Sequence, residues 1–210
     1  MGDEFTWQGL SVFAIDGSKY RLPASDTVRV AFDPDNGLDH PGQGHYPQCL
    51  VSTAYDVFRR LPVACTVQSM AHANEREEVK TLLPHVPSGG VLRLDRGDPS
   101  DELIAYLQRY DQGYWRIRCP ASATFPAVEA FGQSGRAEAV ITLQPPQAEP
   151  IRLRVPRLTS PEGERSVLLT NLQDPARFPA SAVIDQYFRR WAVEIDQPYN
   201  LHKSDSRWMM

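Results

Sequence analysis

The alternation of apolar and polar positions predicts that the chain begins with strands. Residues 10–15 form a short, partly β-branched apolar run before an Asp-Gly-Ser sequence. They predict a buried strand that ends at a turn, with Asp16 at the strand's end. Residues 49–57 and 63–70 predict two further strands. Between the first and second strands, the Gly-, Pro- and Asp-rich residues 33–47 predict a loop.

Helical spacing comes next and alternates with strands. Residues 74–85 predict a helix that has an asparagine as N-cap and glutamates in its first turn. Residues 91–94 predict a strand that runs directly into Asp95. Ser100 caps a second predicted helix, and residues 114–119 predict another strand.

Strand periodicity returns in the last third of the chain and is followed by a helix. Alternating runs at 139–143, 151–155 and 167–170 predict an antiparallel β insertion over residues 121–175. Residues 180–194 have the apolar spacing of a final helix. This order of elements predicts an α/β fold, a mixed sheet with flanking helices.

Composition narrows the class of protein. The chain has 210 residues, of which 41% are hydrophobic and 23% charged, as is usual for a globular domain. No apolar run approaches the roughly 20 residues that a membrane helix needs, and the first residues do not resemble a signal peptide. Three widely spaced cysteines fit no zinc or disulfide framework. We therefore expect a cytoplasmic protein with no membrane partner.

Charge is distributed unevenly along the chain. Residues 1–112 hold 10 Lys and Arg against 16 Asp and Glu, whereas residues 113–195 hold 10 against 8. An acidic half suits divalent metal and a basic half suits phosphate. A solvated surface explains the same distribution. Charge alone leaves both interpretations open.

Three carboxylates are placed where a phosphodiester-cleaving site needs them. Asp16 and Asp95 follow predicted strands, and Glu194 lies on the predicted last helix. Two-metal cleavage needs a few carboxylates on rigid elements, and Mg²⁺ prefers oxygen ligands. An aspartate after a strand is also a common turn residue. His72 and Glu75 precede the first helix, and capping and solvation explain them as well as metal binding does; an extra acid near the site is a further alternative.

Short motifs in a fixed order resemble the IS4-type DDE transposases. They are residues 7–9 (Trp-Gln-Gly) with 14–18 (Ala-Ile-Asp-Gly-Ser) and 22–23 (Leu-Pro), 46–48 (Tyr-Pro-Gln), 94–97 (Leu-Asp-Arg-Gly), 152–153 with 168–172, and 187–194, which fits a Tyr-(2)-Arg-(3)-Glu signature. Each motif is modest, but their order is specific. The resemblance covers about residues 7–194.

The resemblance implies a ribonuclease-H-like fold, with the β insertion between the second aspartate and the glutamate. It implies that Asp16, Asp95 and Glu194 are catalytic and ligate Mg²⁺ or Mn²⁺. It further implies that Tyr187 and Arg190 contact DNA phosphate, since positions 187, 190 and 194 share one helix face. Packing in the core is the alternative role for Tyr187.

The resemblance also implies a division of the chain. The expected parts are a catalytic core at 7–195, made of a first ribonuclease-H-like part at 7–120, the β insertion at 121–175 and the catalytic helix at 178–195, and then a divergent tail at 196–210. The lysine that ends the family signature would fall at Leu201, so Lys203 is the nearest candidate for that DNA contact. We therefore expect an incomplete copy of the family's sequence.

The implied function is metal-dependent cleavage and transfer of DNA strands during transposition. The implied partners are double-stranded DNA, as transposon ends and target, and further copies of the chain on that DNA. The expected location is the bacterial cytoplasm, at the nucleoid when bound. Two alternatives remain: an inactive transposase remnant that binds DNA or a subunit, and another ribonuclease-H-like nuclease such as a resolvase. The Tyr-Arg-Glu spacing argues against the second.

Overall fold

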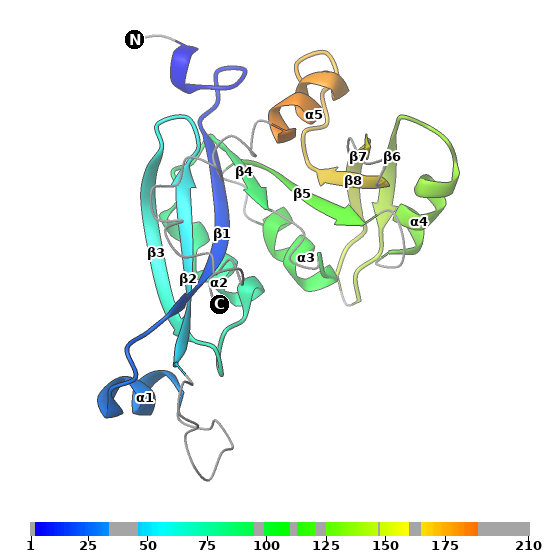
Figure 1. Ribbon diagram of the computed structural model, residues 1–210. Coiled ribbons are helices and arrows are strands. Elements are labelled where there is room, and N and C mark those ends of the chain that lie inside the picture. Colours follow the sequence, from blue (N-terminus) through cyan, green and yellow to red (C-terminus); the bar gives the residue numbers. More distant parts are fainter. Residues whose placement is uncertain are drawn as a thin grey trace, which may run out of the picture.

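A single mixed sheet organises the protein. The computed structural model describes residues 3–33, 46–94, 99–109, 113–120, 125–146, 148–159 and 165–188. In these ranges eight strands form one sheet in the order β3-β2-β1-β4-β5-β8-β7-β6 (Figure 1). The strands are β1 (Val12–Arg21), β2 (Gln48–Asp56), β3 (Leu61–Ser69), β4 (Val91–Leu94), β5 (Tyr114–Pro120), β6 (Glu138–Leu143), β7 (Ile151–Thr159) and β8 (Arg165–Thr170). The helices are α1 (Asp26–Phe32), α2 (Glu75–Leu82), α3 (Asp101–Arg109), α4 (Pro126–Gln133) and α5 (Ala180–Phe188), with short 3-10 turns at Asp3–Phe5 and Leu83–His85.

The short strand β4 is the centre of the sheet. It pairs in parallel with β1 on one side and with β5 on the other, and all four of its residues are buried. The connections between these parallel strands contain α2 and α3, as parallel pairing requires. Antiparallel pairs extend the sheet at both sides, through β2 and β3 and through β8, β7 and β6. The predicted mixed α/β sheet with flanking helices is therefore confirmed.

Caps and apolar stripes explain α2 and α3. Asn74 accepts a hydrogen bond from the backbone N–H of Arg76, and the first turn of α2 carries glutamates that suit the positive end of the helix dipole. Ser100 accepts from the N–H of Leu103 at the start of α3. Both helices form where the sequence predicts them, because each has a cap followed by one buried stripe.

The sheet has two covered faces, distinguished by alternate residues of each strand. We call the first the α2–α3 face; α2, α3 and α4 cover it, and its core contains Phe13, Ile15, Leu92, Leu94, Trp115 and Ile117. We call the opposite one the α5 face; its core contains Leu10, Val91, Leu168, Phe178, Val183 and Tyr187. Figure 1 shows α3 and α5 on opposite sides of β5.

Strand β1 differs from the prediction at the residue of greatest interest. It continues through Asp16 to Arg21, so the expected turn at residues 16–18 is wrong. The reason is pairing with β2, which continues past Asp16 through Gly17 to Arg21. A full ladder of backbone hydrogen bonds outweighs the turn preference of Asp-Gly-Ser.

Two helices were not expected, and three strands extend the sheet. The helix α1 buries none of its residues, and α4 begins with Pro126 at its first turn and buries Val128 and Phe131. The strands predicted as an antiparallel insertion form as β6, β7 and β8, and β8 pairs directly with β5.

In the described part of the chain, no helix is long and apolar enough to cross a membrane.

Candidate active site

Asp16 follows the last described residue of β1 that pairs with the parallel strand β4. On one side of β1 it pairs with Thr53 of β2. On the other side, the last described pair between β1 and β4 is Ile15 with Leu94. Asp16 is exposed and lies near the carboxyl end of β4, where open α/β sheets place their binding sites. The next residue in the sequence after Leu94 is Asp95.

A small pocket opens beside Asp16. Its volume is about 50 Å³, and its lining includes Asp16 from β1, Ser52 from β2, Leu94 from β4 and the first two residues of α2, Glu75 and Arg76. Glu75 therefore lines the same pocket as Asp16. The pocket lies on the α2–α3 face, because Ile15 and Leu94 of that core also line it.

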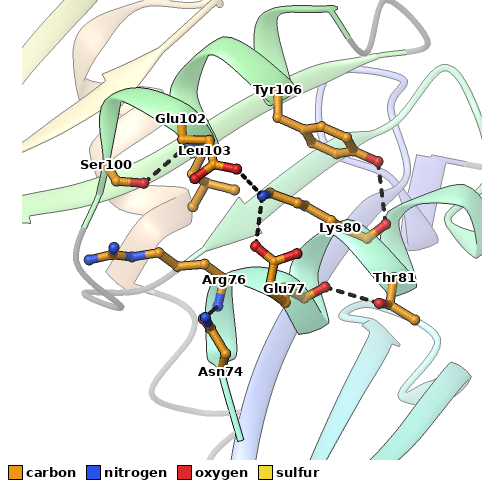
Figure 2. Close-up of polar contacts among 9 residues, drawn as sticks. All are labelled: Asn74, Arg76, Glu77, Lys80, Thr81, Ser100, Glu102, Leu103 and Tyr106. Atoms are coloured by element: carbon orange, nitrogen blue, oxygen red, sulfur yellow. Dashed lines mark hydrogen bonds and ion pairs between the residues drawn. The ribbon is translucent and has the colours of Figure 1, made fainter. Parts of the chain in front are cut away.

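A polar network fixes the two helices behind this pocket (Figure 2). The ammonium of Lys80 on α2 donates to Glu77 at 2.7 Å and, across to α3, to Glu102 at 2.5 Å. The hydroxyl of Tyr106 on α3 donates back to the carbonyl oxygen of Lys80 at 3.3 Å. These partners raise the pKa of Lys80, first through the hydrogen bond that Lys80 donates to Glu102, and Lys80 in turn lowers the pKa of Glu102.

The last described helix, α5, lies on the same face as the side chain of Asp16. Ala14 pairs with Arg93 of β4, so residues 14 and 16 share the face that carries Arg93. The guanidinium of Arg93 donates to the carbonyl oxygen of Tyr187 on α5 at 3.4 Å and lies 5.8 Å from the centre of its ring. Tyr187 is 2% exposed. Packing in the core, the alternative considered for Tyr187, is what the structure shows for its ring.

The other predicted site residues lie outside the described ranges. They are Asp95, Arg190, Glu194 and Lys203. Among described residues, no group of three or more His, Cys, Asp or Glu side chains is close enough to hold a metal ion. The metal-ligand set of Asp16, Asp95 and Glu194 therefore stays a prediction.

Comparison with known proteins adds independent evidence. No protein-family model matches the chain. The transposase InsG for insertion sequence element IS4 of Escherichia coli (strain K12) is 26% identical to it over 198 residues, which are 90% of this chain and 43% of that protein. The chain resembles the IS4-type transposases. The motif-based resemblance is thereby confirmed over nearly the whole chain.

A solved transposase shares the fold. The cryo-EM structure of the piggyBac transposase synaptic complex with hairpin DNA superposes with a TM-score of 0.51 at 13% identity, covering 85% of this chain and 37% of that one. This likeness confirms the ribonuclease-H-like architecture. The chain spans less than half the length of both transposases.

The sequence analysis did not predict the buried arginines that lie between the sheet and α5. Arg93, Arg116 and Arg154 are each no more than 2% exposed. Arg154 follows the alternating pattern of Ile151-Arg152-Leu153, which predicts a solvated side chain, yet it is buried and Arg152 is exposed. One signal was present: Arg93 interrupts an otherwise apolar central strand, where a solvated charge has no place.

Proposed function

We propose that this chain forms the catalytic part of a DNA transposase, which cleaves a DNA strand and transfers the freed 3′ end to target DNA. One observation carries the proposal. Asp16 lies beside the carboxyl end of β4, the strand that runs directly into Asp95, and α5 crosses the same face. This arrangement supports the proposal that β1, β4 and the chain that follows α5 bring the three carboxylates together.

The donor set suits a hard divalent cation. Asp16 provides an exposed carboxylate on a rigid strand, and Asp95 and Glu194 are the proposed further ligands. Oxygen donors of this kind suit Mg²⁺ or Mn²⁺. When bound, such ions activate the attacking oxygen and stabilise the leaving oxygen of a phosphodiester. The chain's own contribution is to hold Asp16 on a strand of the sheet, so that its position does not have to form during the reaction.

Double-stranded DNA is the proposed partner. Arg190 and Lys203 are the proposed phosphate contacts, because guanidinium and ammonium groups bind phosphate oxygens. A direct DNA contact of Tyr187 is a weaker part of the proposal, since its ring is buried against Arg93. Pairing of two transposon ends implies more than one copy of the chain. The proposed place of action is the bacterial cytoplasm, where the DNA is.

The test is nicking of supercoiled plasmid in Mn²⁺, together with calorimetric titration of Mn²⁺ into the protein. The variants are Asp16→Asn and Asp95→Asn. We expect each to lower the nicking rate at least about 100-fold, a loss of about 2.7 kcal/mol of transition-state stabilisation. We also expect the heat of Mn²⁺ binding to disappear in Asp16→Asn, because the amide removes a charged ligand.

The matched control is Asp185→Asn, which changes the same charge at an exposed position of α5. It should nick plasmid and bind Mn²⁺ like the parent protein. If the parent nicks plasmid and Asp16→Asn nicks it equally fast, Asp16 has no catalytic role. Plasmid binding without nicking or Mn²⁺ binding in the parent protein would favour the inactive remnant.

A further inference from the structure

Three buried arginines form one row across the α5 face. Arg93 of β4 pairs with Arg116 of β5, Arg116 pairs with Thr170 of β8, and Thr170 pairs with Arg154 of β7. Residues paired in this way lie side by side on one face of a sheet. Four neighbouring strands therefore present three guanidinium groups and one threonine along a line perpendicular to the strands.

Each arginine donates to the backbone of α5 or of the segment that leads into it. Arg154 donates through Nη1 to the carbonyl oxygen of Phe178 at 2.5 Å. Arg116 donates through Nη1 to that of Val183 at 3.1 Å, and Arg93 through Nη2 to that of Tyr187 at 3.4 Å. The three acceptor residues follow one another in the sequence in the same order as the donor strands β7, β5 and β4 lie in the sheet.

The spacing of these contacts defines the direction of α5. Four residues of α5, from Val183 to Tyr187, rise by roughly 6 Å. One strand spacing, as between β5 and β4, amounts to roughly 5 Å. The two lengths match, so α5 runs along the arginine row and nearly perpendicular to the strands. Its carboxyl end therefore points past β4 toward β1, the strand that carries Asp16.

Net stability does not explain arginine at the centre of this row. Arg116 is fully buried, and its pKa lies well below the usual value, first because of burial and then because of the neighbouring charge of Arg93. Its Nε and Nη2 have no hydrogen-bond partner among the described residues. Apolar residues of similar volume commonly replace buried charges at no cost in stability, or with a gain.

We infer that Arg116, with Arg93 and Arg154, is a positioning residue that sets the angle at which α5 crosses the sheet. The inference rests on the proposed function in one respect: the angle matters for catalysis because the residues after Phe188 lead to Glu194. A guanidinium can fix the orientation of a helix, because its planar donors bind a carbonyl oxygen at a defined position. An apolar side chain has no such directional contact. Arg116 acts through α5 and not on the DNA itself.

The direct test measures the orientation of α5 without any reaction. The exposed native thiol of Cys65 on β3 and a second thiol introduced by Asp185→Cys receive spin labels, while Cys49 and Cys119 are buried. Pulsed electron paramagnetic resonance then gives the distribution of distances between β3 and α5. We expect Arg116→Met to shift this distribution or to make it at least twice as wide. An unchanged distribution would overturn the inference.

The matched control is Arg157→Met, since Arg157 serves α4 in the same manner. It donates to the carbonyl oxygens of Phe131 at 3.0 Å, Gly132 at 3.1 Å and Arg136 at 2.8 Å. Its loss should leave the distance between β3 and α5 unchanged. Equal broadening in both variants would mean general loosening of the fold and would refute a specific role for Arg116.

The nicking activity is a second readout, and it distinguishes failure of the positioning role from failure of the proposed function. We expect Arg116→Met to lower the Mn²⁺-dependent nicking rate constant about 10- to 100-fold, the effect of a misplaced catalytic group, while the Kd for plasmid stays unchanged. Arg116→Lys, which keeps the charge and one donor, should recover part of the rate. Equal loss of DNA affinity and rate would count against positioning. If the parent protein does not nick DNA at all but Arg116→Met still broadens the distances, the positioning role stands and the proposed function fails.

One variant guards against loss of folding. If Arg116→Met shows no native circular dichroism, the distances between β3 and α5 are measured in Arg116→Lys instead, because this variant changes the donor geometry without removing the charge. A distance distribution for Arg116→Lys identical to that of the parent would then overturn the inference, since a bare charge would suffice.

Discussion

The two faces of the sheet hold their helices in different ways. On the α2–α3 face, apolar side chains from strands and helices form one continuous core. On the α5 face, a smaller apolar cluster is joined by three buried arginines that donate to main-chain carbonyls. Apolar packing tolerates small rotations of a helix, whereas hydrogen bonds from a fixed guanidinium do not. The α5 face, where hydrogen bonds from arginines orient the helix, is also the face that carries the side chain of Asp16.

This difference separates what stabilises the fold from what orients the proposed site. Burial of apolar surface is the dominant favourable contribution to folding and is not directional. Buried cations contribute little to net stability but select one arrangement among several, a role documented for some buried polar groups. We therefore expect substitutions on the α2–α3 face to change the free energy of unfolding. Those beneath α5 should change geometry and rate.

The largest expected effect on stability comes from truncating the α2–α3 core. Leu82 of α2 is fully buried, so Leu82→Ala should lower the free energy of unfolding by about 2–5 kcal/mol, from lost burial and the cavity that remains. Arg116→Met should leave it within about 1 kcal/mol of the parent value or raise it. Urea unfolding followed by circular dichroism measures both. A larger loss in Arg116→Met than in Leu82→Ala would break the comparison between the faces.

A smaller effect is expected where the central strands begin. A Cβ at Gly113 would lie 2.7 Å from the carbonyl oxygen of Gly90, which accepts from the N–H of Tyr114. Because that obstacle is backbone, Gly113→Ala should cost about 1–3 kcal/mol. The change would disturb β4 and β5 together, and so both faces at once. In the control Gly17→Ala, the added methyl meets only the flexible end of Leu50 at 3.0 Å, and urea unfolding should show a smaller loss.

The sequence predicts the α2–α3 face better than the α5 face. Caps at Asn74 and Ser100 and the apolar stripes behind them suffice to predict α2 and α3, because local preference and burial agree there. The turn after Ile15 was wrong, since cross-strand pairing with β2 is not visible in local sequence. The arginine row was missed for the same reason: only the register shows that Arg93 and Arg116 are neighbours.

The candidate site was predictable only in part. Motif resemblance identified Asp16, and the structure places it next to the last described pair between β1 and β4. The pocket that it shares with Glu75 depends on the tertiary position of α2. Spacing along a helix placed residues 187 and 194 on one face, but it did not show that Tyr187 would be buried against Arg93. The roles of Asp95 and Glu194 stay predictions from the motifs.

The smallest expected effect concerns the ion pairs at the rim of the α2–α3 face. Lys80 lowers the pKa of Glu102, so this contact adds stability above the unfolded-state pKa of about 4.3 and loses it as the pH falls through the lower folded-state pKa. Glu102→Gln should lower Tm near neutral pH by about 1 °C or less, because exposed pairs contribute little and Lys80 keeps Glu77 as a partner.

The difference in Tm between parent and variant should shrink as the pH falls through the lowered folded-state pKa of Glu102, because the carboxyl group of the parent then becomes neutral as well. It should shrink at high salt as well, because salt screens exposed charges. Thermal unfolding at neutral and acid pH, in low and high salt, measures both trends. A difference that persists in acid would mean that Glu102 stabilises α3 through packing. Polar contacts would then matter on both faces of the sheet, and the contrast between them would lie only in burial.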